Sequence, residues 1–257
     1  MSSLEVRGVR FSWPGSPPVL RGVSLRLERG TVAAVLGPNG VGKSTLLDLC
    51  LGWQEPEAGE VLLEGAPVAR MSRADRGRRL SLVPQRENVR FDFLVLDYVL
   101  LGRAPHLRPL QLPGTRDRRI ARSALSAVGI AGLADRSITT LSGGEYQLML
   151  IARSLAQEPA VLLLDEPGSH LDPGHRLLIM RTLRRLTRRG ISVLLTSHDP
   201  QGAAAVADTV HLMKAGRIRF SGTPRAVLTA SRLRAVYGVP FTVRWTRGRF
   251  TCAFEAP

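Results

Sequence analysis

Hydrophobic and polar residues alternate near the start of the chain, in residues 4–11 and again in residues 23–27. Between these stretches lies the Pro-Gly-Ser-Pro-Pro sequence of residues 14–18, a composition typical of turns. Alternation with a period of two indicates strands that bury one face and expose the other. The pattern therefore predicts a β-hairpin or a small antiparallel sheet in residues 4–29.

Three later stretches are apolar nearly throughout, at residues 31–36, 160–164 and 191–196. Strands that are covered by helices on both faces have this continuous apolar pattern, because neither face meets water. Shorter apolar runs at residues 61–63 and 80–83 indicate two further strands. The three long runs predict a mostly parallel sheet.

The strand pattern stops between residues 86 and 159. Residues 94–101 are apolar, and in residues 117–129 and 143–157 the apolar positions recur at steps of three and four. Such spacing places the apolar side chains on one face of an α-helix. We therefore interpret residues 86–159 as a mostly helical subdomain inserted into the chain.

Helices and strands alternate again in the last third of the chain. The pattern predicts helices at 174–189 and 203–207, a hairpin over 210–220, and short helices followed by strands at 242–245 and 250–254. With 257 residues, of which 44% are hydrophobic, the chain is long enough for one sizeable α/β core. We interpret residues 1–257 as a single domain.

The formal net charge is +15, and arginines are spread along the whole chain. A biased arginine-rich composition explains this charge most simply; a contribution from a membrane surface comes next, and nucleic acid is the partner class least favoured. No apolar run approaches the roughly 20 residues of a membrane span, and the first residues lack the features of a signal peptide. We expect a cytoplasmic protein whose isolated Cys50 and Cys252 are reduced structural thiols.

Residues 37–45 match the phosphate-binding pattern G-x-x-x-x-G-K-[ST], with an apolar strand before them and a helical pattern after them. Glycines let backbone N–H groups turn inward toward phosphate oxygens, Lys43 supplies a point charge, and the Ser44 hydroxyl can hold Mg²⁺. The alternative is an ordinary glycine-rich turn. Lys43 is one of only two lysines in this arginine-rich chain, the other being Lys214, which favours a position that requires lysine.

Polar residues follow the predicted buried strands at their carboxyl ends, where ligands bind in parallel sheets. Asp165 and Glu166 follow residues 160–164, and His198 follows residues 191–196. Gln85 follows a shorter strand and, taken alone, is more often a loop residue. Trp13 precedes the first turn; packing at a sheet edge is the simpler interpretation, and stacking on a flat ligand is the alternative.

At Leu141-Ser-Gly-Gly-Glu145 the sequence resembles a known family. The phosphate loop, Gln85, this pentapeptide, residues 161–167, Ser169-His-Leu-Asp172 and His198 occur in the order found in ATP-binding subunits of ABC transporters. The resemblance covers essentially the whole chain. It implies an α/β fold with a P-loop NTPase (RecA-like) core, an N-terminal antiparallel β-subdomain and an inserted helical subdomain. Residues 101–106 and 236–239 resemble the importer branch that serves iron–siderophore, haem and vitamin B12 uptake.

The resemblance implies an ATP site built largely from the phosphate loop. The residues that would bind ATP are Trp13, Gly37, Pro38, Asn39, Gly40, Val41, Gly42, Lys43, Ser44 and Thr45. Trp13 takes the place of a tyrosine that usually stacks on adenine. Mg²⁺ would be coordinated by Ser44 and Gln85 and, through water, by Asp165. Glu166 would act as the general base, His198 would contact the γ-phosphate and the attacking water, and Lys43 would complete the catalytic set.

A second copy of the chain would complete the site in a head-to-tail dimer. Its Ser142, Gly143, Gly144 and Glu145 would contact the ATP held by the first copy, and Asp172 would lie at the dimer interface. The sequence departs from the usual family pattern at Trp13, Tyr146, Leu148 and Gly168. Every expected catalytic position is present.

These implications lead to an expected function. The chain would be the Mg²⁺-dependent ATPase of an importer for an iron chelate, acting through separate transmembrane subunits and, indirectly, an extracytoplasmic substrate-binding protein. It would sit peripherally on the cytoplasmic face of the membrane. The alternatives are an ABC importer or exporter for another substrate, a non-transport ABC ATPase acting on nucleic acid, and a nucleotide-binding scaffold without useful turnover.

Overall fold

The structure is a computed structural model that describes residues 2–85, 87, 89, 91–169 and 171–254. Its largest sheet, among these residues, has six strands in the order β10-β9-β3-β8-β7-β6. The strands are β3 (Val32–Leu36), β6 (Leu80–Val83), β7 (Val161–Leu164), β8 (Ser192–Ser197), β9 (Thr209–Lys214) and β10 (Arg217–Gly222). All neighbours pair in parallel except β9 and β10, which form the predicted hairpin. The apolar runs at residues 31–36, 80–83, 160–164 and 191–196 are therefore buried parallel strands, whereas the run at 61–63 lies in a different sheet.

A second, antiparallel sheet lies against the first. Its order is β2-β1-β4-β5, from β1 (Ser2–Phe11), β2 (Leu20–Glu28), β4 (Ala58–Leu63) and β5 (Ala66–Pro67). The alternating residues of β1 and β2 point inward and share one apolar core with α1 (Lys43–Cys50). The predicted antiparallel sheet is thus confirmed, with β4 and β5 as further members.

The helix after the phosphate loop begins earlier than predicted. The helical pattern that follows residues 37–45 predicts a helix from residue 46 onward, but α1 begins at Lys43. Gly42 has a φ of 104°, a left-handed conformation that glycine adopts without strain, and this conformation turns the chain directly into the helix. As a consequence Lys43 and Ser44 lie in the first helical turn instead of in the loop.

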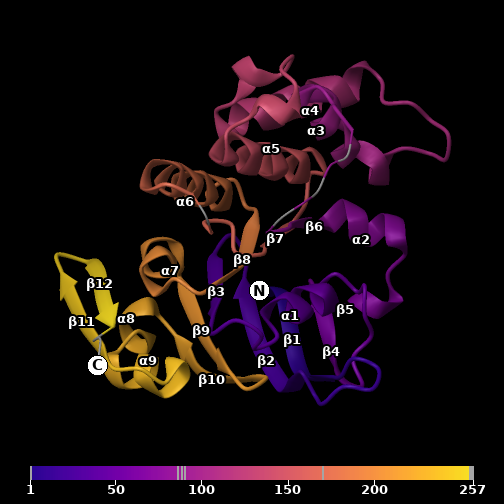
Figure 1. Cartoon of the computed structure of the whole chain (residues 1–257). Coiled ribbons are helices and arrows are strands. Elements are labelled where there is room, and N and C mark those ends of the chain that lie inside the picture. Colours follow the sequence, from indigo (N-terminus) through magenta and orange to yellow (C-terminus); the bar gives the residue numbers. More distant parts are fainter. Residues whose placement is uncertain (1, 86, 88, 90, 170, 255–257) are drawn as a thin grey trace.

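The helical segment lies at the top of Figure 1, where α5 packs against β6 of the parallel sheet. It follows α2 (Arg73–Arg79) and β6 and contains α3 (Val95–Leu100), α4 (Thr115–Val128) and α5 (Gly143–Ala156) with the short 3-10 helices η2 (Leu101–His106), η3 (Ala131–Leu133) and η4 (Ile138–Thr140). Tyr98, Leu125 and Leu148 are fully buried between its helices. The predicted helices are confirmed. The boundaries at 86 and 159 stay a prediction, and residue 86 lies outside the described residues.

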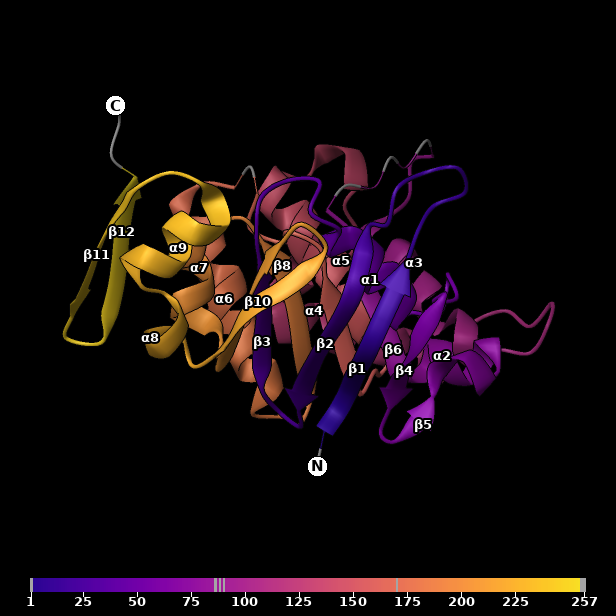
Figure 2. The ribbon, with the colours of Figure 1, turned by 90° about the horizontal axis from the view of Figure 1, so that it is seen from below.

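The remaining helices cover the parallel sheet and lead to the C-terminal hairpin. They are α6 (Pro173–Thr187), α7 (Pro200–Val206), α8 (Pro224–Val227) and α9 (Ala230–Tyr237). The hairpin of β11 (Phe241–Thr246) and β12 (Arg249–Phe254) packs on α7 and α9. In Figures 1 and 2 it lies at the opposite end of the molecule from α2. Within the described ranges, no helix is both long and apolar enough to cross a bilayer.

Candidate active site

The phosphate loop joins β3 to α1 and leaves the first N–H groups of that helix without a side-chain cap. Two longer helices, α5 and α6, do have side-chain caps. Ser142 accepts a hydrogen bond from a backbone N–H in the first turn of α5, and Asp172 accepts from backbone N–H groups in the first turn of α6. An uncapped N-terminus presents N–H donors and a positive dipole end to an anion. The loop therefore has the geometry and the polarity to hold phosphate oxygens.

Lys43 is nearly buried, with 6% of its side chain exposed. Its ammonium donates to the carbonyl oxygens of Gly37 (2.9 Å) and Pro38 (3.1 Å) and lies 3.2 Å from Glu166 Oε1. A buried charge is tolerated only where such partners compensate for its lost hydration. The loop thus fixes the ammonium at its own centre, next to the acidic end of β7.

Glu166 contacts several other residues of the site. It follows β7 with a φ of 47°, and its N–H donates to Thr196 Oγ1 at 3.0 Å. Glu166 Oε2 lies 2.8 Å from His198 Nδ1. Burial would raise the pKa of Glu166, but the hydrogen bond to His198 and the charge of Lys43 outweigh burial and hold the pKa below its ordinary value. The carboxylate is therefore ionised and points into the site.

The side chains expected to hold Mg²⁺ come from three different segments of the chain. Gln85 Nε2 lies 3.5 Å from Glu166 Oε2 and 3.4 Å from Ser169 Oγ. Asp165 Oδ1 accepts a hydrogen bond from the Thr196 hydroxyl. Ser44 is exposed in the first turn of α1. Among the described residues no group of three or more His, Cys, Asp or Glu could hold a metal ion by itself. Mg²⁺ commonly takes one or two protein oxygens and completes its shell with phosphate and water, so this sparse oxygen set fits it.

An open cavity of about 440 Å³ lies between the phosphate loop and the N-terminal sheet, and Asp165 and His198 are not among its lining residues. Its lining is Trp13, Val19, Asn39, Gly40, Gly42, Lys43, Ser44, Thr45, Gln85 and Glu166. Trp13 is 37% exposed at the rim and packs edge-on against Phe11, with ring centroids 5.0 Å apart and an interplanar angle of 88°. The fold therefore brings an aromatic face and the phosphate loop to one cavity.

The Leu141–Glu145 signature lies elsewhere and does not line this cavity in the described part of the chain. Ser142 caps α5, and in return its N–H donates to Glu145 Oε2 at 2.8 Å. Gly144 is covered by the His175 ring, since a Cβ at Gly144 would lie 2.0 Å from a ring carbon. His175 is in turn held by Asp172. One chain thus assembles the Trp13-to-Glu166 set and leaves the signature set apart.

Comparison with known proteins decides the family. The sequence model of the ABC transporter family matches residues 20–169. The chain belongs to this family.

Among its relatives, the hemin import ATP-binding protein HmuV of Pseudomonas putida is 41% identical over 249 residues and 94% of each chain. HmuV of Myxococcus xanthus is 40% identical, with 92% of this chain and 90% of the relative covered. Among solved structures, a transporter described as metal-chelate type, in an inward-facing conformation, superposes with a TM-score of 0.86 at 32% identity and covers 99% and 97% of the two chains. CbiO1 from Clostridium perfringens, part of the complex cbiONQ, gives a TM-score of 0.80 at 31% identity, with 91% and 93% covered.

As an ABC ATPase, the chain binds and hydrolyses ATP as one subunit of a transporter. The sequence-based interpretations as a nucleic-acid ATPase or an inactive scaffold therefore lose their support. The role of each site residue is a separate matter and stays a prediction. His170, within the Ser169-His-Leu-Asp172 motif, lies outside the described residues.

Sequence reasoning missed two polar residues of this ABC ATPase. Thr196 bonds to both Asp165 and the Glu166 backbone, and it is buried directly after three apolar residues of β8. A buried hydroxyl group needs a hydrogen-bond partner, so a threonine at the end of this apolar run could have indicated a polar contact there. Asp48, on α1, was also missed; burial first, and then the neighbouring Asp165 carboxylate, raise the pKa of Asp48. Nothing in the local sequence of Asp48 indicates this proximity.

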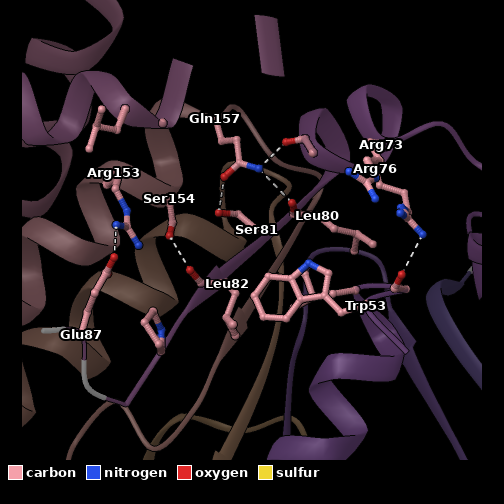
Figure 3. Close-up of a pocket in the computed structure, with 16 residues that line it drawn as sticks. Trp53, Arg73, Arg76, Leu80, Ser81, Leu82, Glu87, Arg153, Ser154 and Gln157 are labelled. Carbon is pink, nitrogen blue, oxygen red and sulfur yellow. Dashed lines mark hydrogen bonds and ion pairs between the residues drawn. The ribbon is translucent and has the colours of Figure 1, made fainter. Parts of the chain in front are cut away.

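A second cavity of this ABC ATPase, of about 870 Å³, forms a groove between α2, β6, η2 and the end of α5. Figure 3 shows Gln157 at its upper wall: its amide oxygen accepts from Ser81 Oγ at 2.6 Å, and its nitrogen donates to Leu80 O at 3.1 Å. Arg153 pairs with Glu87 at 2.8 Å on one side, and Trp53, 62% exposed, lies on the other. We call this cavity the α2–α5 groove.

Proposed function

We propose that this ABC ATPase drives the import of haem or a closely related iron chelate through separate membrane subunits. The observation that carries the proposal is the 41% identity to a hemin import ATP-binding protein over 94% of both chains. The similarity to a transporter described as metal-chelate type supports the same substrate class. The chain would lie peripherally on the cytoplasmic face of the membrane, and a substrate-binding protein outside the membrane would select the cargo.

ATP would occupy the 440 Å³ cavity, with its phosphates on the loop and its base against Trp13. Phosphoryl transfer needs positioning and charge stabilisation more than covalent chemistry. Lys43 and the N–H groups of α1 would supply positive potential. Ser44, Gln85 and Asp165 would hold Mg²⁺, which neutralises phosphate charge when it is bound. Glu166 would orient the attacking water and accept its proton, with His198 hydrogen-bonded to the same carboxylate.

A second copy, placed head to tail, would bring Ser142, Gly143, Gly144 and Glu145 to the γ-phosphate of the first. The separation of the signature from the cavity within one chain supports this arrangement. Asp172 would lie at the same interface. The His175 ring that covers Gly144 would have to move aside. ATP would then hold the two copies together, and hydrolysis would release them.

The α2–α5 groove would receive a segment of the membrane subunit. It is large enough for a short helix, and Gln85 precedes the groove residue Glu87 by two positions. Movement at the γ-phosphate would therefore reach the groove through the stretch that begins at Gln85.

Uptake of labelled haem, ferric siderophore and vitamin B12 tests the proposal in cells that carry Lys43→Ala. Lys214→Ala serves as the matched control, because Lys214 lies on β9 with its ammonium on the Ala235 carbonyl. Loss of haem uptake in Lys43→Ala alone supports the proposal. Loss of only another compound identifies a different cargo, and unchanged uptake of all three overturns the importer assignment to this branch.

A further inference from the structure

The loop between η2 and α4, residues 107–114, carries the most exposed leucines of the described chain. Leu110 is 102% exposed and Leu112 is 84% exposed. Leu110 also has a φ of 66°, a left-handed conformation that costs energy for a leucine. Large apolar side chains held in water at this extent mark interaction surfaces.

This loop is anchored at its base. Asp117 accepts from Arg103 at 2.9 Å and from the Gly114 N–H at 3.0 Å, so one carboxylate ties together the chain before and after the loop. Arg103 is buried, and His106 Nε2 lies 2.9 Å from the Gln157 carbonyl oxygen. The Arg108 N–H donates to Gln111 Oε1, also at 3.0 Å, and closes the tip. The two leucines are therefore presented by a firmly held structure.

The surroundings of the tip are strongly basic. Residues 107–123 contain five arginines and a single acid, Asp117, which Arg103 neutralises. Four of these arginines, at positions 116, 118, 119 and 122, are exposed along the first half of α4, and Arg108 is exposed in the loop itself. Only Arg118 among them has an ion-pair partner that the structure records, Asp97 at 3.7 Å. Exposed leucines set among arginines match the chemistry of an anionic lipid surface.

The loop also projects in the appropriate direction. It directly follows η2, whose Leu101 and Gly102 line the α2–α5 groove. In Figures 1 and 2 the loop that leads into α4 extends beyond α2, away from the C-terminal hairpin. A membrane subunit seated in the groove would place the bilayer on this side.

We propose that residues 107–114 form a membrane-surface contact, in which Leu110 and Leu112 enter an anionic bilayer and the arginines of the loop and of α4 bind its lipid phosphates. Such a contact is weak alone, since stable attachment needs more than one signal. A subunit already tethered by a partner gains from a weak second contact, because tethering raises its effective concentration. The contact would set the tilt of the helical segment relative to the membrane.

Sedimentation of the full-length protein with vesicles tests the proposal without any membrane subunit. We expect binding to phosphatidylcholine vesicles that contain phosphatidylglycerol and little binding to phosphatidylcholine alone, with the difference reduced at high salt. Leu110→Ser/Leu112→Ser should weaken binding at least about tenfold. Arg108→Gln/Arg116→Gln should weaken it roughly fivefold for each arginine.

Matched controls carry the same changes elsewhere. Leu177→Ser/Leu178→Ser alters two exposed leucines of α6, and Arg244→Gln/Arg249→Gln alters two exposed arginines of the C-terminal hairpin. All four double variants should keep the ATPase rate of the wild type, which shows that they fold. Equal vesicle binding by the loop variants and their controls overturns the proposal.

A probe at the tip separates insertion from general attraction of a basic protein. A polarity-sensitive fluorophore on Leu110→Cys, in a Cys252→Ser background that leaves only the buried Cys50, should shift to the blue with anionic vesicles. If the protein sediments with anionic vesicles but the fluorophore does not shift to the blue, the proposal that the leucines enter the bilayer is wrong. A different result would assign the loop to a protein partner instead. In that case the wild type does not bind vesicles, and Leu110→Ser/Leu112→Ser no longer co-purifies with the membrane subunit. Vesicle binding with no haem uptake defect in Lys43→Ala overturns the proposed cargo alone.

Discussion

Lys43 Nζ lies 3.2 Å from Glu166 Oε1, so the lysine of the phosphate loop and the acid at the end of β7 form an ion pair. Both side chains are largely buried. A γ-phosphate that enters the loop competes with Glu166 for the same ammonium. In the proposed mechanism, binding of ATP would therefore free the carboxylate to orient water, and this exchange would link nucleotide binding to the formation of the hydrolytic site.

Glu166→Gln should reduce ATP hydrolysis by about 10²- to 10⁴-fold and leave ATP binding nearly unchanged, because the amide fills the same space but cannot accept a proton. Phosphate release and equilibrium nucleotide binding measure the two effects. Glu60→Gln is a suitable control, since Glu60, on β4, pairs with Arg7 and is not among the residues that line the cavity. An unchanged hydrolysis rate in Glu166→Gln would show that another group is the base.

Lys43→Ala should weaken ATP binding, and Lys214→Ala should not. The first change removes a buried positive charge that faces the phosphate loop, whereas Lys214 lies outside the cavity. Lys43→Ala also leaves Glu166 without its ion pair, so the pKa of Glu166 should rise toward or above its ordinary value. Titration calorimetry with ATP compares the two variants, and equal affinities would remove Lys43 from the site.

Trp13→Ala should weaken ATP binding by about 1–3 kcal/mol, a range typical for one base stacked on an aromatic ring. Trp13→Phe keeps a flat ring and should retain most of the affinity. Nucleotide should also quench the fluorescence of Trp13, measured in a Trp53→Phe/Trp245→Phe background. If Trp13→Ala binds ATP like the wild type, the tryptophan is only a packing residue of the sheet edge.

Ser142 has two separable roles, because it caps α5 and is proposed to contact the ATP of a second copy. Ser142→Ala should lower stability by about 1 kcal/mol through the lost cap. Ser142→Asp keeps a good cap but places a negative charge where a phosphate is expected, so it should fold normally and fail to dimerise with ATP. Thermal unfolding and ATP-dependent dimerisation by gel filtration distinguish these outcomes. Normal dimerisation of Ser142→Asp would contradict the proposed interface.

His211 should make the protein less stable in mildly acidic solution. It is 4% exposed on β9, and burial lowers its pKa from 6.5 to about 4. Below pH 6.5 the His211 side chain is protonated in the unfolded chain but stays neutral in the folded chain. The free energy of unfolding is therefore highest above pH 6.5 and falls as the pH drops toward 4. Between about pH 6.5 and about pH 5 the loss should be about 1.5 kcal/mol.

Urea unfolding at several pH values measures this loss, with His211→Gln as the variant that should abolish it. The lowered pKa values of Glu166 and Asp172 do not affect this measurement. Their carboxylates stabilise the folded state above their ordinary pKa values of 4.5 and 3.8, and this stabilisation is lost only at lower pH. If the free energy of unfolding of His211→Gln depends on pH as it does in the wild type, another group causes the acid sensitivity.

Local patterns in the sequence determined most of the elements and the position of the glycine-rich loop. The apolar runs at 31–36, 160–164 and 191–196 gave the buried strands, because a strand with both faces covered can hold few polar residues. The spacing of glycines and Lys43 identified the loop, because backbone N–H groups must turn inward at fixed positions. These properties depend on neighbours along the chain, and a single sequence displays them.

Only the tertiary structure decided which distant residues meet. Strand order places β7 beside β8, and this adjacency brings Thr196 to Asp165 and His198 to Glu166. The packing of α6 against α5 sets His175 over Gly144. Such contacts depend on the geometry of the whole sheet and its helices, which local periodicity does not encode. The same reason explains Leu110: its sequence context shows an apolar residue between prolines, and only the fold shows that it faces water at the end of an anchored loop.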